Sequence, residues 1–503
     1  MIRRIERARL LGAADTGATG LGPDRLRSEA LVDIEIASDG TIAAVTAAGS
    51  TGSGPAGSVD TLDAAGRFVT SGLWDEHVHL GQWAQQASRL DFGELTSAQQ
   101  VLDRVAAAAA AGAQEIIAMR VRGSAWGDEL TRERIDAAGG DVPVVLISVD
   151  LHGAWLSSAA LRQYGHDALG ASHLVEDECF ALLRELDRIE EGELDRRISS
   201  AASAAAARGV VGVVDFEMRW GADDWTRREA SGFDALRVES AVYPQHLERA
   251  IGAGFRTGDA LTKSGRLRFG PLKVITDGSL GTHTAWCCEP YPDGEHGLSL
   301  VGFDELEALL RRAHESGISA AVHAIGDRAG AAALDAFERV GCGGRIEHAQ
   351  LLRREDVARF AALGVEASVQ PEHLIDDRDA IARLWPGRAE RAFPFASLLN
   401  AGARLRFGSD APVAPLDPWR AIAAAVHRSL PGEPVWVPAE RLTVEQALRA
   451  SMRGKLRPAV GDAADLVLLD ENPLRMSQAD LAAPPVAATL LGGKITHADA
   501  GLR

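Results

Sequence analysis

The sequence predicts an α/β protein: a parallel (β/α)8 barrel with insertions, accompanied by a small sheet that both ends of the chain build. Three observations lead to this prediction. The chain of 503 residues is long enough for one large domain and a smaller one. Short strand-like runs with glycine-containing turns occur at both ends of the chain. Between them, strand-like runs alternate with helix-like stretches.

The two ends of the chain share one pattern. Near the N-terminus, two alternating apolar runs are separated by Asp39-Gly40, which is typical of a β-hairpin. Near the C-terminus, two further apolar runs are separated by a turn at Gly492. We therefore expect residues 1–70 and 440–503 to form one composite β domain.

The middle of the chain, residues 71–439, has the alternation of a parallel sheet, and its length suits a (β/α)8 barrel. The segment at about 124–208 has the texture of an insertion or of an elaborated second βα unit. The strand-like runs are 68–80, 114–123, 142–150, 210–217, 267–278, 318–326, 344–350, 365–372 and 404–412. The clearest helix-like stretches are 97–113, 179–209, 303–317 and 354–364.

The negative charge of the chain limits the kinds of molecule that it is expected to bind. With 53 basic and 71 acidic side chains the formal charge is −18, which argues against nucleic acid or an anionic membrane as the main partner. The four cysteines form no CxxC pair, and no apolar run is long enough for a signal peptide or a membrane span. We expect a cytoplasmic protein that acts on a small molecule, with a homodimer as one option for its oligomeric state.

Histidine and aspartate recur where strand-like runs end. His77 and His79 close the first run of the middle segment, and strand periodicity places both imidazoles on one face. His323, His348 and Asp410 close later runs in the same way. A single histidine at such a place is more often an ordinary core residue. Repeated at several strand ends, these residue types predict a site for Zn²⁺ or a similar divalent ion at the carboxyl end of the barrel.

Lys273 lies inside an apolar run, in a chain with only four lysines. One interpretation is a lysine that extends from a strand end into water. The other uses what arginine cannot do: a desolvated lysine loses its proton, and the neutral amine can take up CO₂ to form a carbamate that bridges two metal ions. Asp215 and Glu217 are rival carboxylate ligands, but they lie one strand too early.

Six segments together resemble the metal-dependent amidohydrolase superfamily: SGLWDEHVHL, LKVITDGSLG, HAIGDRA, RIEHAQ, SVQPEHLIDD and FGSDAPV. Within it they look most like the YtcJ-like branch, which includes N-substituted formamide deformylases and AepA-type proteins. The similarity runs nearly from end to end. It implies a (β/α)8 barrel beside a small β-sandwich formed from both termini.

The resemblance also implies a ligand set for two divalent metal ions, with zinc expected and Lys273 N-carboxylated. The matching positions are His77, His79, Lys273, His323, His348 and Asp410. Two such ions share a hydroxide and polarise the scissile carbonyl, while Asp410 acts as general base and passes the proton to the leaving amine.

The expected activity is hydrolysis of an amide-like C–N bond in an N-acyl amine, an N-formyl amine or a cyclic amide. Esters and lactones use the same chemistry. Two alternatives are a mononuclear deaminase-like enzyme, against which an intact Lys273 argues, and a catalytically silent regulatory protein, which should have lost ligands. Residues next to strand ends or in a matching loop are candidate substrate contacts: His152, Trp155, Asp277, Arg328, Gln370 and His373.

Overall fold

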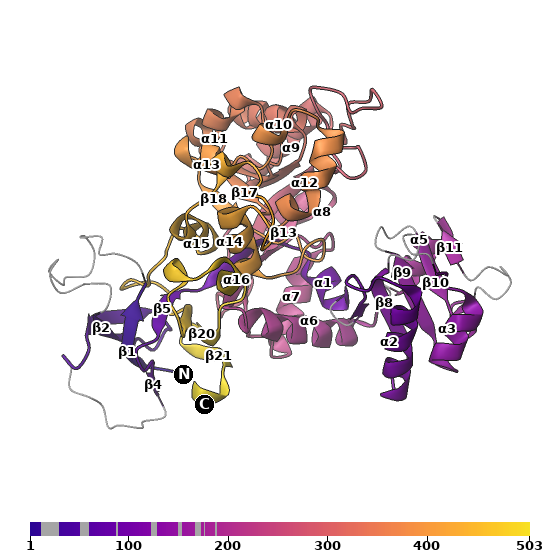
Figure 1. Cartoon of the computed structure of the whole chain (residues 1–503). Helices are drawn as coiled ribbons and strands as arrows, with labels where there is room; N and C mark the ends of the chain where they lie inside the picture. The colour runs from indigo at the N-terminus through magenta and orange to yellow at the C-terminus, as the bar shows by residue number, and fades with distance from the viewer. Residues whose placement is uncertain are drawn as a thin grey trace. The chain divides into compact units, whose positions relative to one another are not determined.

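The computed structural model describes the whole chain except residues 12–29, 51–59, 87–88, 122–127, 149–152, 166–172, 176, 187–188 and 503. The chain forms two compact units. The first contains Met1–Leu80 and Ala202–Arg503, and the second contains Gly81–Ala201 (Figure 1). None of the helices in the described ranges combines the length and the apolar character that crossing a membrane requires.

An eight-stranded sheet forms the centre of the first unit, in the order β18-β17-β16-β15-β14-β13-β12-β6. Each pair of neighbours is parallel, and a parallel bridge from Val78 to Ala411 brings the two edges of the sheet together. The predicted (β/α)8 barrel is therefore confirmed. Its strands are β6 (Leu73–Val78), β12 (Val210–Asp215), β13 (Arg237–Val242), β14 (Leu267–Ile275), β15 (Ala320–Ala324), β16 (Gly344–His348), β17 (Val365–Val369) and β18 (Leu405–Phe407).

One barrel strand differs from the runs expected from the sequence. Strand β13 (Arg237–Val242) carries Arg237 and Glu239, so it has no continuous apolar run. Both side chains form ion pairs, with Asp465 and Arg453. The runs 114–123 and 142–150 instead belong to the sheet of the second unit, because an apolar run marks a strand without specifying its sheet.

Helices surround the barrel strands and bury their apolar faces with them in one core. Leu310, Leu334 and Phe337 are buried in that core, on α9 and α10. The helices of this unit beyond residue 202 are α7 (Gly221–Ala230), α8 (Pro244–Gly252), α9 (Phe303–Glu315), α10 (Asp327–Val340), α11 (Val357–Leu363), α12 (His373–Leu384), α13 (Phe395–Asn400), α14 (Pro418–His427), α15 (Val444–Ser451) and α16 (Gln478–Leu481).

The chain ends together build a second eight-stranded sheet, as the sequence predicts, and both ends lie next to it (Figure 1). Antiparallel pairing of Leu468 with Val69 joins the C-terminal strands to the N-terminal ones. The predicted turns are present, with Gly40 and Gly492 both at positive φ. The strands are β1 (Arg4–Leu10), β2 (Leu31–Ile36), β3 (Ile42–Ala47), β4 (Thr61–Asp63), β5 (Phe68–Ser71), β19 (Leu466–Leu469), β20 (Val486–Leu491) and β21 (Lys494–Ala498).

The second unit has its own five-stranded sheet, in the order β11-β10-β9-β8-β7. Two apolar clusters of buried residues pack within it, so Gly81–Ala201 has a core of its own. Its strands are β7 (Leu90–Asp91), β8 (Ile116–Val121), β9 (Val144–Ser148), β10 (Gly153–Leu156) and β11 (His173–Val175). Its helices are α2 (Ala98–Ala110), α3 (Arg132–Gly139), α4 (Ser158–Gln163) and α5 (Asp177–Leu186), while α1 (Leu80–Gln86) and α6 (Glu191–Ala206) cross the unit boundaries.

Candidate metal centre

Closure of the parallel barrel gathers the candidate ligands at one end. The carboxyl ends of all eight strands meet there, and the register aligns His323 with Glu347 and Ala324 with His348. His348 and Asp410 both have positive φ, at 69° and 58°. This conformation is uncommon for residues other than glycine, and it is concentrated at functional sites.

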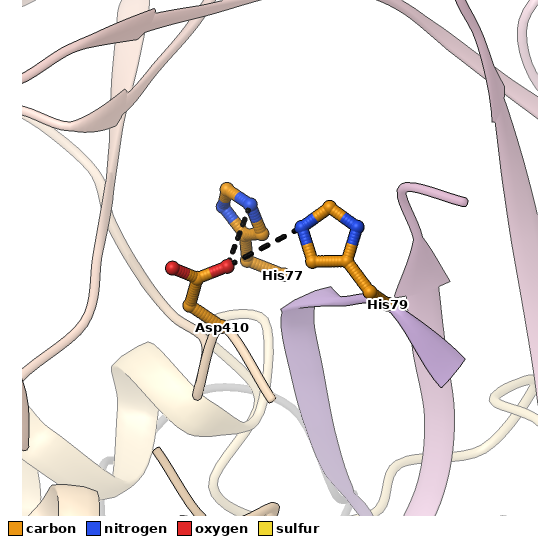
Figure 2. Close-up of side chains that lie close together, drawn as sticks. All are labelled: His77, His79 and Asp410. Carbon is orange, nitrogen blue, oxygen red and sulfur yellow. Dashed lines mark ion pairs between the residues drawn. The ribbon is translucent and has the colours of Figure 1, made fainter. Parts of the chain in front are cut away.

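Asp410 and the two histidines of the first strand form a first group of possible ligands. Oδ1 of Asp410 lies 3.4 Å from Nε2 of His77 and 3.4 Å from Nε2 of His79, and the three side chains converge (Figure 2). One ligand atom from each lies within 4.8 Å of the others. This spacing suits a single ion.

A second group shares Asp410. It consists of His348, His373 and Asp410, again with ligand atoms within 4.8 Å of one another. Nε2 of His373 lies 3.9 Å from Oδ2 of Asp410, so the two carboxylate oxygens are directed to different histidines. From the sequence alone, His373 is predicted to contact substrate. Its place just after β17, following SVQPE, is the same strand-end signal that identified the other histidines.

Lys273 on β14 reaches this cluster from inside the barrel. It is 2% exposed, and its Nζ lies 3.1 Å from Nε2 of His77 and 4.2 Å from the centre of the Phe216 ring. Burial lowers the pKa of Lys273 to about 8, although the carboxylates of Glu347 and Asp410 oppose the shift. A neutral amine is therefore accessible near neutral pH.

His323 lies beside the second group without being part of it. Its ring packs edge-on against His348, with the ring centres 4.6 Å apart. Nδ1 of His323 lies 3.1 Å from Oδ1 of Asp277, which is fully buried. Asp277 also accepts hydrogen bonds from the backbone N–H groups of Trp286, Ile325 and Gly326. Asp277, proposed from sequence as a substrate contact, thus stabilises the loop that follows His323.

Of the other predicted substrate contacts, only Gln370 has a described contact with the histidine cluster. Gln370 is buried and places Nε2 3.2 Å from Nδ1 of His77, so it contacts a candidate metal ligand. Arg328 is exposed, with its guanidinium 4.6 Å from the centre of the Trp286 ring. Trp155 belongs to the second unit, where it stacks on His173 at 4.4 Å, and His152 is outside the described residues.

Asp215, a rival carboxylate ligand in the sequence analysis, has a structural role. Its carboxylate accepts hydrogen bonds from the backbone N–H of Leu80 and from Nε1 of Trp225. Those bonds connect the end of β12 to α1 and α7 and use both carboxylate oxygens.

The charge states of the cluster suit a divalent cation. Burial, reinforced by the charge of Lys273, lowers the pKa of His77 well below its ordinary value, and burial beside His323 does the same for His348. Burial opposes ionisation of Asp410, but the neighbouring histidines outweigh it and hold the pKa of that carboxyl below its usual range. Neutral imidazoles and an ionised carboxylate are the forms that bind metal.

The buried ring nitrogens provide a further test of the fit. Within the described ranges, Nδ1 of His348 and Nε2 of His373 are buried without a hydrogen-bond partner, as is Nδ1 of His79, whose Nε2 is the nitrogen that faces Asp410. Buried polar atoms are seldom left in this state, because each one forfeits its hydration without replacement. Nitrogen and carboxylate donors of this kind fit zinc or a similar ion.

Three known proteins are similar to this chain over most of its length. The chain is 31% identical over 481 residues to "Protein LONG AFTER FAR-RED 3" of Arabidopsis thaliana, covering 85% of this chain and 82% of that one. It is 28% identical over 485 residues to "Putative amidohydrolase YtcJ" of Bacillus subtilis, covering 86% and 89%. It is 25% identical over 503 residues to the N-substituted formamide deformylase of Arthrobacter pascens, covering 88% and 90%.

A metal-dependent hydrolase structure from Pyrococcus furiosus shares the fold, with a TM-score of 0.75, 24% identity and coverage of 94% of this chain and 99% of that one. The family model described as "Amidohydrolase family" matches residues 60–497, which include every candidate ligand named above. The chain therefore belongs to the amidohydrolase family, in its YtcJ-like branch.

Proposed function

We propose that the protein is a binuclear amidohydrolase that cleaves an amide-like C–N bond in an N-acyl amine, an N-formyl amine or a cyclic amide. One observation carries the proposal: Asp410 lies between two histidine groups and belongs to both. Two sets of ligands around a shared carboxylate support two adjacent ions, because a single catalytic zinc typically uses three protein ligands. Zinc is the expected metal, since imidazole and carboxylate are among its usual ligands.

Bound divalent ions at such a site lower the pKa of water and polarise a carbonyl group. The residues of the chain supply the remaining steps. Asp410 is ionised, so it can accept the proton of the attacking water and deliver it to the leaving nitrogen. His77, His79, His348 and His373 would supply ring nitrogens to the ions, and burial keeps the pKa values of His77 and His348 low, so these two imidazoles stay neutral. The same arrangement also serves esters and lactones.

The proposal includes N-carboxylation of Lys273. Its amine is buried 3.1 Å from a ring nitrogen of His77, so a carbamate formed there would carry two oxygens toward the ligand cluster. Attack of the neutral amine on CO₂ forms the N–C bond and releases one proton. The resulting negative charge requires cations nearby, so carboxylation and metal loading should be coupled.

Lys273→Ala should lower metal content and activity together, and a short carboxylic acid such as acetate should restore part of both. Lys273→Arg should fail as well, because guanidinium neither deprotonates nor carboxylates. Lys263→Ala, at an exposed lysine, is the matched control. Isotope-labelled bicarbonate should label the wild-type protein and not Lys273→Ala. An unlabelled wild-type protein that is fully loaded with metal contradicts the carbamate.

The activity is tested by assaying N-acyl amines, formamides, cyclic amides and lactones with zinc-loaded protein, together with elemental analysis. N-substituted formamides come first, because one relative is named for their deformylation. We expect roughly two metal equivalents per chain and hydrolysis of a C–N bond. One equivalent with deamination supports the mononuclear alternative. Absence of metal, with no activation by zinc, manganese or cobalt, supports a silent regulatory protein.

A further inference from the structure

A chain of buried charged side chains leads from the metal centre into the barrel. Nδ1 of His77 lies 2.7 Å from Oε2 of Glu347. The other oxygen of Glu347 lies 2.8 Å from Nε of Arg345, and Nη1 of Arg345 donates to Oε2 of Glu76 at 3.0 Å. The side chains of His77, Glu347 and Glu76 are at most 2% exposed, and that of Arg345 is 11% exposed.

We propose that Glu347 is a positioning residue for the metal centre: it holds the ring of His77 so that Nε2 faces the ligand cluster, and Arg345 fixes Glu347 in turn. A neutral imidazole has one N–H group and one free lone pair. A carboxylate only accepts hydrogen bonds, so Glu347 at 2.7 Å fixes the proton on Nδ1 and leaves the lone pair on Nε2. Nε2 is also the atom that lies 3.4 Å from Asp410.

The backbone of β16 explains how one strand serves both the ligand and its support. In a regular strand, consecutive side chains point to opposite faces, so Arg345 and Glu347 share the interior of the barrel. His348, the next residue, would then point away from it. Its φ of 69° departs from the extended conformation, and its ring lies 5.2 Å from that of His77. Glu347 and His348 therefore both contribute to the same site.

Gln370 is the other neighbour of Nδ1 of His77, at 3.2 Å. Its Oε1 is buried without a partner within the described part of the chain. An amide turned to present Oε1 would accept from the same N–H as Glu347 does, which favours the same tautomer. The Gln370 amide is neutral, whereas Glu347 is a carboxylate that Arg345 holds at 2.8 Å, so Glu347 is the stronger support.

The experiment measures zinc affinity of the folded apoprotein by competition with a chelator, without substrate. Glu347→Gln should weaken zinc binding by about 10–100-fold, the range typical of lost outer partners of ligand histidines. The variant also leaves Arg345 without its nearest carboxylate, which can disturb folding. The double variant Arg345→Met/Glu347→Gln removes that unpaired charge, so it should fold more stably than Glu347→Gln while its zinc affinity stays low.

Glu366→Gln is the matched control. Glu366 pairs with Arg406 at 3.0 Å inside the same barrel, and no described contact joins it to His77. Its zinc affinity should equal that of the wild type. Wild-type zinc affinity in Glu347→Gln, an equal loss in Glu366→Gln, or restored affinity in the double variant overturns the positioning role.

This inference rests on the metal centre of the proposed function, and the two can fail separately. A wild-type protein that binds zinc and hydrolyses none of the compounds contradicts only the proposed activity. Hydrolysis by the wild type, combined with unchanged zinc affinity in Glu347→Gln, contradicts only the positioning role. A wild type without zinc affinity contradicts both.

Discussion

The two ends of the barrel bury different kinds of polar side chain. At the carboxyl end, imidazole nitrogens of His79, His348 and His373 are buried with no hydrogen-bond partner in the described ranges. At the amino end, buried arginines and glutamates pair with one another. Glu76 contacts Arg345 and Arg453 there. That end also contains a cavity of about 430 Å³, lined partly by these same side chains.

The difference distinguishes a site from a structural network. Leaving a buried polar group unpaired costs about 1–3 kcal/mol, which a bound ion can offset. In a buried ion pair, the two side chains already offset each other's desolvation cost, so a bound ligand would add little stabilisation. Charged residues alone therefore do not mark the active end of this barrel. The imidazoles gathered around the shared carboxylate of Asp410 do.

The largest effect is expected at the carboxyl end. Asp410→Asn should lower turnover by about 10²–10⁴-fold, because an amide cannot accept a proton at neutral pH. Much of the metal should remain, since the amide oxygen can still contact a cation. Steady-state kinetics and elemental analysis check both parts. Wild-type turnover in this variant shows that another group is the base.

At the amino end, the expected effect is on stability. Arg453 donates to Glu76 and Glu239 at 2.6 Å each. Arg453→Met leaves the buried Glu76 with one partner fewer, and the free energy of unfolding in urea should fall by about 3–5 kcal/mol. The zinc content of the folded variant should not change. If Arg453→Met loses zinc while its free energy of unfolding is unchanged, the amino end serves the metal site and not stability, which contradicts this prediction.

The next expected effect, at the carboxyl end, is a dependence of stability on pH that comes from His348. Burial beside His323 lowers the pKa of His348, so the folded protein leaves this imidazole neutral where the unfolded chain protonates it, below pH about 6.5. Metal-free wild type should therefore lose stability relative to His348→Asn between pH about 7 and 5, by at most about 1.4 kcal/mol per pH unit. Urea unfolding at each pH measures the difference. A difference independent of pH contradicts the neutral buried imidazole.

The smallest effect is expected at the rim of the amino end. Arg404 pairs with Glu366 at 2.9 Å, but its side chain is 69% exposed. Arg404→Ala should change the free energy of unfolding by less than about 1 kcal/mol, as is usual for exposed pairs. Compared with Arg453→Met, this variant tests whether burial decides the value of a pair. Equal losses in the two variants would show that it does not.

Much of the fold and the site could be predicted from the sequence, because both depend on local patterns. Alternating strand and helix texture predicts the barrel, and the apolar runs place His77, His323, His348 and Asp410 at strand ends. Lys273 is conspicuous for a similar reason, as a lysine inside an apolar run. The sequence did not show which sheet a strand joins: the run 114–123 was expected among the barrel strands, but it belongs to the five-stranded sheet of the second unit.

The sequence by itself determined which residue types stand at the ends of the barrel strands. Only the tertiary structure decided which of them meet: His373 joins His348 and Asp410, while His323 packs beside them against Asp277. It also decided that Glu347, which is 270 positions from His77, is the neighbour of that ring. The physical reason is that barrel closure and a few unusual backbone angles set these distances, and neither is encoded in a local pattern of residues.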